Sequence, residues 1–301
     1  MTDSRLPIVG FVGVGDMGGP MARNLLLAGF RVIVCDVQAA RVQTLVSAGA
    51  TAALGARQVA DQAEVVLACL NSVEAMRSVA AAVALGSAVK VYADLSTSGP
   101  TLAQALRQPF STTQIEMLDA PISGQINRAE DGTLAIMVSG AKAAYELAKP
   151  VFDVVGEHIF YLGAVAGGGQ MMKVANNLIN NVQTLATSEA IAMGLKFGLD
   201  AEQMFAVLNV STGRNSQTDG QLRSAVLEND FNKGAVISIT KKDITLAVEE
   251  AERIGVITPT ARAAKDLILA AYATGDGTQR SASVFLHVAE QSGLAVDQDK
   301  G

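Results

Sequence analysis

The sequence predicts a protein of two domains, first an α/β domain with a doubly wound parallel sheet and then an all-α domain. Three observations predict this organisation. Apolar runs typical of strands alternate with helix-like patterns through the first half of the 301 residues. Three consecutive glycines at 167–169 interrupt that alternation, and long helical patterns with few strand signals follow. We therefore expect one domain over residues 1–164 and a second over 165–301.

The first domain is predicted from strand and helix patterns that follow one another in sequence. Strands are expected at 8–14, 31–35, 64–70, 88–94, 115–119 and 133–138, with helices between most of them at 17–28, 39–48, 73–85 and 99–107. A further helix at 141–154 and a short strand at 158–161 complete this half. Such alternation indicates right-handed crossovers and a mainly parallel sheet. Because the strands are apolar on both faces, helices should cover both sides of the sheet.

The second domain is predicted from helical patterns alone. Residues 170–197 form one candidate helix, on the order of 40 Å long. Further helices are expected at 201–208, 217–227, 239–254, 258–273 and 281–290. The last residues, 297–301, are predicted to be a frayed polar tail.

Composition excludes several classes of protein. Half of the residues are hydrophobic, 17% are charged and the net charge is -6, which argues against a disordered chain and against a nucleic-acid partner. Residues 1–7 are too short and too polar for a signal peptide, and no apolar stretch reaches the roughly 20 residues of a membrane span. We therefore expect a cytoplasmic protein that does not bind membranes.

The cysteines and histidines predict neither disulfides nor a metal site. Cys35 and Cys69 each lie inside an apolar run, which favours two reduced core thiols. His158 and His287 are the only histidines, and neither lies in a site-like context. Since a zinc site needs a cluster of His and Cys ligands, zinc-dependent chemistry is not expected.

A glycine motif near the N-terminus predicts a nucleotide site. The sequence Gly13-Val-Gly-Asp-Met-Gly18 follows an apolar strand and opens a helix, as in a Rossmann-type βαβ unit. The first glycine permits the tight turn, the second lets a pyrophosphate approach the backbone, and the third lets helix and strand pack closely. The start of the helix offers unpaired N–H groups to the phosphates. The cofactor residues predicted here are Gly13, Gly15, Asp16, Met17 and Gly18.

An acidic residue at the end of the second strand predicts which dinucleotide binds. Asp36 lies eighteen residues after Gly18, where a carboxylate would bond a free ribose 2′-hydroxyl and repel a 2′-phosphate. Val37 and Gln38 follow it, so no arginine comes directly after the acid. This pattern favours NAD over NADP as the cofactor.

Four ordered blocks give the chain a resemblance to a known family. The sequence from Gly10 to Leu25, GFVGVGDMGGPMARNL, resembles the opening of the β-hydroxyacid dehydrogenases, which include 3-hydroxyisobutyrate dehydrogenase and tartronate semialdehyde reductase. The other blocks are Asp94–Thr97, Asp119–Gly124 leading to Gly132–Leu134, and Gly167–Asn177, and a Lys242-Asp243 pair is also typical. The resemblance covers nearly the whole chain.

The resemblance implies roles for individual residues. Lys173 would be the catalytic lysine and Asn177 would orient the substrate, while Ser123 and Gly124 would bind the substrate carboxylate. The residues expected to line the nicotinamide side of the cofactor cleft are Leu70, Asn71 and Thr97, with Lys242 beside it. Family members are typically dimers or tetramers assembled through the helical domain, so a homodimer or homotetramer is expected.

The residue pattern of the long helix also favours a catalytic role for Lys173, independently of the family resemblance. Lys173, Asn177, Asn180, Asn181 and Thr184 recur at three- and four-residue spacing and form a polar stripe on an apolar helix. The stripe starts at the glycine cluster, which places it at the predicted cleft between the domains. A partly desolvated lysine there can take a hydroxyl proton in one direction and return it in the other. The alternatives are that Lys173 extends to solvent or pairs with an acid.

One block departs from the family pattern. The family usually continues after the serine with small residues and glycines, whereas this chain has Gln125-Ile-Asn-Arg128. We therefore expect Gln125 or Arg128 to contact a polar substituent of the substrate. The polar stretch 211–221, which contains Arg214, is a further candidate for the same pocket.

The sequence thus predicts an NAD-dependent oxidoreductase that interconverts a small 3-hydroxy acid and its semialdehyde or keto acid, with Lys173 as general acid/base. It does not name the acid. An imine reductase is one alternative, although Lys173 and Asp36 argue against it. A non-catalytic nucleotide sensor is another, and such a protein would bind NAD without turnover.

Overall fold

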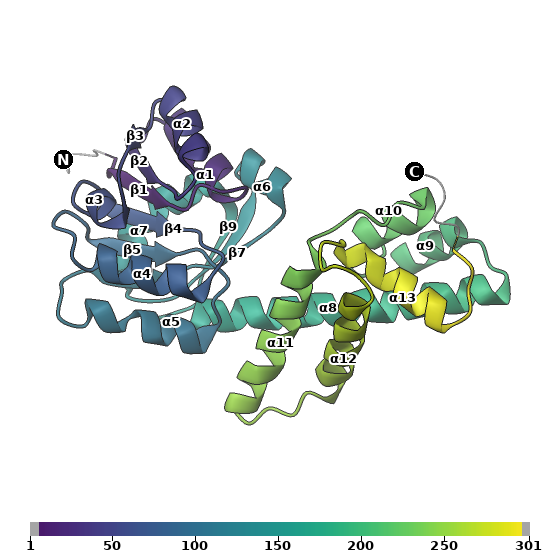
Figure 1. The fold of residues 1–301 in the computed structure, drawn as a ribbon. Coiled ribbons are helices and arrows are strands. Elements are labelled where there is room, and N and C mark those ends of the chain that lie inside the picture. The colour runs from purple at the N-terminus through teal and green to yellow at the C-terminus, as the bar shows by residue number, and fades with distance from the viewer. Residues whose placement is uncertain (1–5, 297–301) are drawn as a thin grey trace. The chain divides into compact units, whose positions relative to one another are not determined.

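The first unit is built on a six-stranded sheet in which all strands are parallel, which confirms the predicted parallel sheet. The computed structural model describes residues 6–296 and divides into compact units between Lys173 and Val174. The predicted tail at 297–301 lies outside the described residues. The strand order is β3-β2-β1-β4-β5-β6, and every adjacent pair is parallel (Figure 1). The strands are β1 (Val9–Val12), β2 (Val32–Cys35), β3 (Thr51–Ala52), β4 (Val65–Ala68), β5 (Val91–Asp94) and β6 (Glu116–Asp119).

Helices cover both faces of this sheet because its strands alternate apolar side chains between two cores. Along β1, Phe11 packs into the core formed with α1 and α7, whereas Val12 packs into the core formed with α3 and α4. The helices of this unit are α1 (Gly18–Leu27), α2 (Ala39–Ser47), α3 (Ala56–Ala60), α4 (Val73–Val83), α5 (Pro100–Leu106), α6 (Ile126–Asp131) and α7 (Lys142–Val155), with a 3-10 turn at Gln108–Phe110. The doubly wound prediction is confirmed.

Two of the predicted strands form a separate small sheet. In the order β7-β8-β9, the strand β8 (Leu134–Val138) pairs antiparallel with β7 (Ile122–Ser123) and parallel with β9 (Gly156–Tyr161). The sequence patterns predicted neither β7 nor α6. Ser123 lies in β7, and Ile126 already begins α6, which ends at Gly132 in the left-handed conformation (φ 69°).

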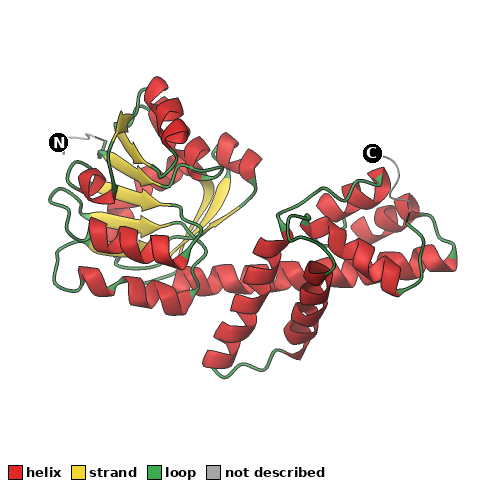
Figure 2. Ribbon diagram, viewed as in Figure 1, coloured by secondary structure: helices red, strands yellow, loops and turns green. Residues whose placement is uncertain are grey.

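The second unit is all-helical within the part that the structure describes. Figure 2 shows helices and connecting loops there, and no strand is assigned over 174–296. The helices are α8 (Gly168–Phe197), which begins in the first unit, α9 (Ala201–Asn209), α10 (Gln221–Glu228), α11 (Ile237–Arg253), α12 (Pro259–Ala273) and α13 (Val284–Gln291), with a 3-10 turn at Ser281–Ser283. Phe205, Ile244 and Phe285 are buried in one core. Among residues 6–296, no helix is long and apolar enough to cross a bilayer.

Candidate cofactor and active site

Two glycines of the N-terminal motif are required by the fold itself. A Cβ on Gly18 would lie 2.0 Å from the Gly13 carbonyl oxygen and 2.9 Å from Cε1 of Phe11. Gly13 has φ +85°, and a Cβ there would lie 2.4 Å from the Cys69 carbonyl oxygen. These contacts bring α1, β1 and the end of β4 together more closely than any other residue type allows. The turn and the close helix–strand packing that the motif predicts are therefore present.

Gly15, the middle glycine of the motif, is not closely packed against other backbone, which leaves room for a ligand. A Cβ on Gly15 would meet only the guanidinium of Arg41 within 4 Å, at 2.5 Å, and that group is the end of a flexible side chain. Packing does not require glycine at this position, so its small size leaves the backbone open to approach. The next helix, α1, has Met17 at its N-cap and no side-chain cap. The Gly19 N–H donates to the Gly15 carbonyl oxygen at 2.8 Å, but no N-cap side chain competes with a phosphate for this end of the helix.

Asp36 is bonded directly to the glycine loop. One carboxylate oxygen accepts a hydrogen bond from the Val14 N–H at 2.8 Å, and the other accepts one from the Gln38 N–H at 2.8 Å. Each oxygen keeps a further lone pair, which a ribose hydroxyl can use. The described residues thus fit a dinucleotide, with glycine backbone for the pyrophosphate and a fixed carboxylate for the ribose.

The predicted nicotinamide-side residues of the first unit follow neighbouring strands. The Leu70 N–H donates to the Ser96 hydroxyl at 2.9 Å, which connects the loop after β4 to the loop that carries Thr97. Cδ2 of Leu70 would also lie 3.0 Å from a Cβ on Gly13. Because the carboxyl ends of parallel strands share one edge, the loops holding Gly13, Leu70 and Thr97 adjoin one another. Asn71 lies exposed next to Leu70.

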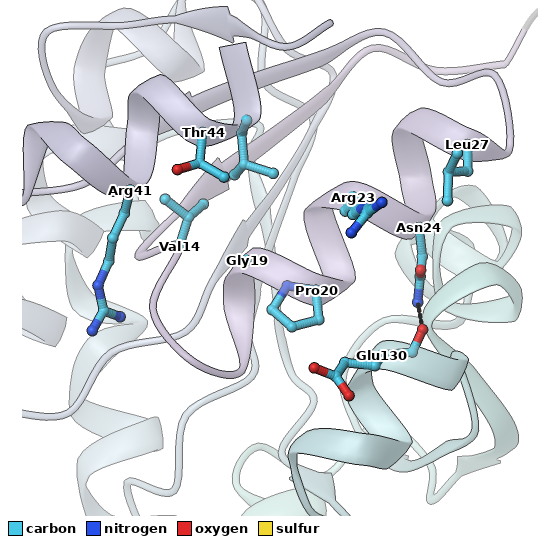
Figure 3. A pocket seen from close by; sticks show the side chains of 10 residues that line it. Val14, Gly19, Pro20, Arg23, Asn24, Leu27, Arg41, Thr44 and Glu130 are labelled. Atoms are coloured by element: carbon cyan, nitrogen blue, oxygen red, sulfur yellow. Dashed lines mark hydrogen bonds between the residues drawn. The ribbon is translucent and has the colours of Figure 1, made fainter. Parts of the chain in front are cut away.

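A pocket of about 380 Å³ adjoins the glycine loop. Figure 3 shows Arg41 on one side, Pro20 and Glu130 on the other, and Asn24 bonded across to α6. Arg41 also pairs with Asp16 at 3.2 Å. Sequence reasoning looked for an arginine directly after Asp36 and so assigned no role to Arg41, five positions later.

Lys173 lies on the first turns of α8 and is only 9% exposed. One turn earlier, the fully buried Gln170 side chain accepts hydrogen bonds from the N–H groups of Ser98 (3.0 Å) and Gly99 (3.1 Å) and donates to the Ser96 carbonyl oxygen (2.7 Å). These bonds flank Thr97 on both sides. The start of the lysine-bearing helix is therefore attached to a loop predicted to contact the cofactor. Sequence reasoning missed Gln170.

The Ser123–Gly124 segment leads directly into α6. Gly124 has φ +147°, and a Cβ there would lie 2.6 Å from Cδ2 of Leu134 and 3.1 Å from Cβ of Arg128. Gln125 takes the N-cap position of α6 and is exposed. The departure from the family pattern is therefore a short helix that packs close to Gly124.

In the second unit, one carboxylate joins two predicted site residues. Nδ2 of Asn177 donates to Oδ2 of Asp243 at 2.9 Å. Nζ of Lys242 lies 3.4 Å from the other oxygen of the same carboxylate. Asp243 is thus a functional candidate that sequence reasoning quoted only as part of a pair. Its place on α11, one residue after the predicted Lys242, was the available signal.

The polar stretch 211–221 packs against the polar stripe of α8. Oδ1 of Asn180 accepts hydrogen bonds from the Ser216 hydroxyl at 3.1 Å and from the Gln217 amide at 3.0 Å. Arg214 instead pairs with Asp219 at 3.2 Å on the surface. The turn around Asn215, whose side chain accepts from the Gln217 N–H, delays the start of α10 to Gln221, four residues after the predicted start.

The two thiols are held in their neutral form. Burial raises the pKa of Cys35 to about 11 and that of Cys69 to about 12, and the nearby carboxylates of Asp36 and Asp94 add to the rise. Neither cysteine forms a disulfide. Over residues 6–296, no group of His, Cys, Asp and Glu side chains is arranged to hold a metal ion.

Two neighbouring strands of the parallel sheet, β5 and β6, each end in a buried carboxyl group. Asp94 of β5 lies opposite Asp119 of β6, and both side chains are fully buried. Burial raises the pKa of Asp94 from 3.8 to about 6; hydrogen bonds from Ser96 oppose the rise, and the charge of Asp119 adds to it. The folded protein therefore favours the neutral Asp94 carboxyl, and ionising it costs stability.

We expect Asp94→Asn to stabilise the protein at neutral pH and to lose that advantage in acid. The raised pKa makes the wild-type free energy of unfolding fall as the pH rises from about 4 to about 6, by about 3 kcal/mol at most. Asparagine carries no charge in this range. Urea unfolding followed by circular dichroism measures the free energy of unfolding of both proteins. The difference between the variant and wild type should widen up to about pH 6 and then stay level. A difference in free energy of unfolding that is the same at every pH would contradict the prediction. The control is Asp266→Asn, which alters an exposed carboxylate on α12.

Comparison with known proteins agrees with this architecture over almost the whole chain. The model of the NAD binding domain of 6-phosphogluconate dehydrogenase matches residues 8–163. The model described as the NAD-binding domain of NADP-dependent 3-hydroxyisobutyrate dehydrogenase matches residues 167–288. The chain belongs to the β-hydroxyacid dehydrogenase family. The resemblance seen in the four sequence blocks is thereby confirmed.

Individual relatives in this family act on short hydroxy acids. The chain is 34% identical to 3-hydroxyisobutyrate dehydrogenase of Pseudomonas aeruginosa, covering 86% of this chain and 90% of the relative. It is 35% identical to the NAD-dependent L-serine dehydrogenase of the same organism, covering 83% and 87%. Among solved structures, Mycobacterium tuberculosis 3-hydroxyisobutyrate dehydrogenase with L-serine has a TM-score of 0.86 at 28% identity, covering 94% and 99%. An imine reductase from Myxococcus stipitatus, at 18% identity and a TM-score of 0.63, shares the fold alone.

Proposed function

We propose that this protein is an NAD-dependent dehydrogenase that interconverts a small 3-hydroxy acid and its semialdehyde or keto acid. The observation that carries the proposal is the place of Lys173, a largely buried lysine on a helix whose start is bonded to the Thr97 loop. Membership of the β-hydroxyacid dehydrogenase family supports the same reaction class.

In the proposed reaction Lys173 moves the proton. Its neutral amine takes the hydroxyl proton of the substrate as the carbinol carbon is oxidised, and its ammonium returns a proton to the carbonyl oxygen in reduction. The bound nicotinamide would accept or supply the hydride. In reduction the ammonium also stabilises the negative charge that grows on oxygen. Lys173 as a residue is 9% exposed and so largely withdrawn from water, and charge interactions are stronger in such surroundings.

The other proposed roles are binding and orientation. Ser123 and Gly124 would hold the substrate carboxylate through a hydroxyl and backbone N–H groups. Asn177 would orient the reacting oxygen, supported by its bond to Asp243, and Gln125 would contact a polar substituent. The proposed cofactor contacts are Gly13, Gly15, Asp16, Met17, Gly18, Asp36, Leu70, Asn71, Thr97 and Lys242.

A substrate screen tests the proposal. The purified protein would be incubated with NAD and a panel of short acids that includes 3-hydroxyisobutyrate and L-serine, the compounds named for its relatives. NADH absorbance should rise with at least one 3-hydroxy acid and should not rise with matched acids that lack the hydroxyl. A protein that binds NADH but turns over no member of the panel would contradict the proposal and favour a nucleotide sensor.

Asp36 is proposed to select NAD, and Asp36→Ser should weaken that selection. The carboxylate bonds a free 2′-hydroxyl and repels a 2′-phosphate, so its loss should lower the ratio of kcat/KM for NAD to that for NADP by about 10- to 100-fold. Steady-state assays with both cofactors measure the ratio. Since Asp36 also accepts a hydrogen bond from Val14, thermal unfolding must show that the variant is folded. An unchanged ratio in a folded variant would show that Asp36 does not discriminate.

A further inference from the structure

We propose that Asp119 is a positioning residue for the reaction, because its carboxylate fixes the start of α8 and thereby the place of Lys173. This inference rests on the proposed function, in which Lys173 moves the proton. It concerns a residue that touches neither substrate nor cofactor in the roles given above.

The Asp119 carboxylate is fully buried and directed at the first turn of α8. It accepts hydrogen bonds from the N–H groups of Gly167 (3.0 Å), Gly169 (2.9 Å) and Gln170 (3.3 Å). It also accepts one from the Ser139 hydroxyl at 2.7 Å, and Arg107 lies 3.3 Å away. A negative charge at this end of a helix is favourable, because the helix N-terminus carries partial positive charge. The carboxylate therefore does for α8 what a capping residue does for an ordinary helix.

The fold does not need this carboxylate to join its two sheets. The backbone of Asp119 already bridges to Ser139 in both directions, with N–H to oxygen distances of 3.1 and 2.8 Å. The side chain adds one bond to Ser139 and one to Arg107, and its three remaining hydrogen bonds go to the helix start. The backbone of Asp119 therefore joins the sheets, and most of the hydrogen bonds of its carboxylate position α8.

The glycine cluster lets the helix approach this carboxylate. A Cβ on Gly169 would lie 2.2 Å from the Met137 carbonyl oxygen and 3.0 Å from Oδ2 of Asp119. A Cβ on Gly167, which has φ +85°, would lie 3.0 Å from Cα of Pro100. The glycines that the sequence presented as a domain boundary therefore dock the helix tightly on the first unit.

A second attachment fixes the same turn from another direction. Gln170 bonds the loop on either side of Thr97, as described above, and Lys173 follows three residues later on the same helix. Asp119 thus holds the helix from β6 while Gln170 holds it from the loop after β5. Because a displacement of about 1 Å at a catalytic group can cost about 100-fold in rate, this double attachment matters for Lys173.

The test is Asp119→Asn, which keeps the shape and replaces an acceptor oxygen with an N–H donor that faces the helix N–H groups. We expect the dissociation constant of NADH to stay within about twofold of wild type, while kcat for the best acid of the panel falls about 10- to 100-fold. Hydrogen exchange at the amides of residues 167–174 should become faster. The control is Asp61→Asn, which alters a surface carboxylate bonded to Ser87 and should change none of these quantities.

A double variant separates positioning from general stability. If Asp119 acts through Lys173, Asp119→Asn should change kcat much less in a Lys173→Met background than in wild type. An equal fold-change in both backgrounds, or unchanged exchange at 167–174, would overturn the inference. If Lys173→Met alone leaves kcat unchanged, the role of the lysine in the proposed function fails as well, so the two failures are distinguishable.

A second variant keeps the inference testable should Asp119→Asn not fold. Gln170→Met removes the attachment to the Thr97 loop and keeps a side chain of similar length. It should reproduce the pattern of lower kcat with NADH affinity retained. Gln62→Met is the matched control, because its exposed amide bonds the Gln58 carbonyl oxygen, which is remote in sequence from the start of α8. Equal kcat in the Gln170 variant and this control would overturn the role assigned to the helix start.

Discussion

Replacing Lys173 with methionine should lower kcat by about 10²- to 10⁴-fold and leave the affinity for NADH almost unchanged. Methionine preserves the length and helix propensity of the side chain and removes the amine that is proposed to act as acid and base. The size of the loss is that of a general acid/base group. Steady-state kinetics and a fluorescence titration with NADH measure the two quantities separately.

Two further variants make this result specific to the proton. Lys196→Met alters another lysine of α8, one that is exposed and bonded to the Ser292 carbonyl oxygen, and should leave kcat unchanged. Lys173→Arg keeps a positive charge that cannot be lost near neutral pH, so it should not restore oxidation of the alcohol. Restored turnover in the arginine variant would show that the charge, and not proton transfer, is what the reaction requires.

Gly18→Ala should destabilise the protein by about 1–3 kcal/mol and weaken NADH binding about tenfold or more. The added methyl would lie 2.0 Å from a backbone carbonyl oxygen and 2.9 Å from the fully buried Phe11 ring, so α1 must move away from β1. That movement displaces the loop that is proposed to bind the pyrophosphate. Thermal unfolding and the NADH titration measure both effects.

Gly55→Ala is the matched control for this substitution. Its Cβ would meet nothing within 4 Å, and its φ of 178° is extended backbone that alanine adopts. The control should keep both the wild-type melting temperature and the wild-type NADH affinity. A Gly18 variant that binds NADH as tightly as this control would contradict the role given to the loop.

How far the fold was predictable depended on the length and pattern of each element. The unit from β1 through α1 to β2 could be predicted because an apolar strand, a glycine turn and a helix pattern occur in order. Shorter elements were missed: β3 has two residues and α3 has five, which is too few to show a period. The helix α6 was not predicted, and its packing depends on Asn24, 105 positions away from Ala129. A contact between residues so far apart in the chain cannot be predicted from the local sequence.

Some residues of the candidate site could be predicted from the sequence and others could not. The cofactor residues were predictable because the glycine motif and Asp36 have a fixed spacing that chemistry requires. The roles inferred for Asp119 and Gln170 were not, because each depends on partners 48 to 74 residues away in the chain. A buried carboxylate that caps a helix is visible only once both elements are placed. Sequence patterns therefore found the groups proposed to touch ligands and missed those that hold them in place.

Transfer of deuterium from substrate to cofactor distinguishes hydride transfer assisted by Lys173 from other reactions. The best acid of the panel, deuterated at its carbinol carbon, would be oxidised with NAD, and the reduced cofactor would be analysed by mass spectrometry. We expect the deuterium to appear in the nicotinamide ring and Lys173→Met to suppress its transfer. Reduced cofactor that carries no deuterium, or transfer that proceeds equally well without the lysine, would contradict this expectation.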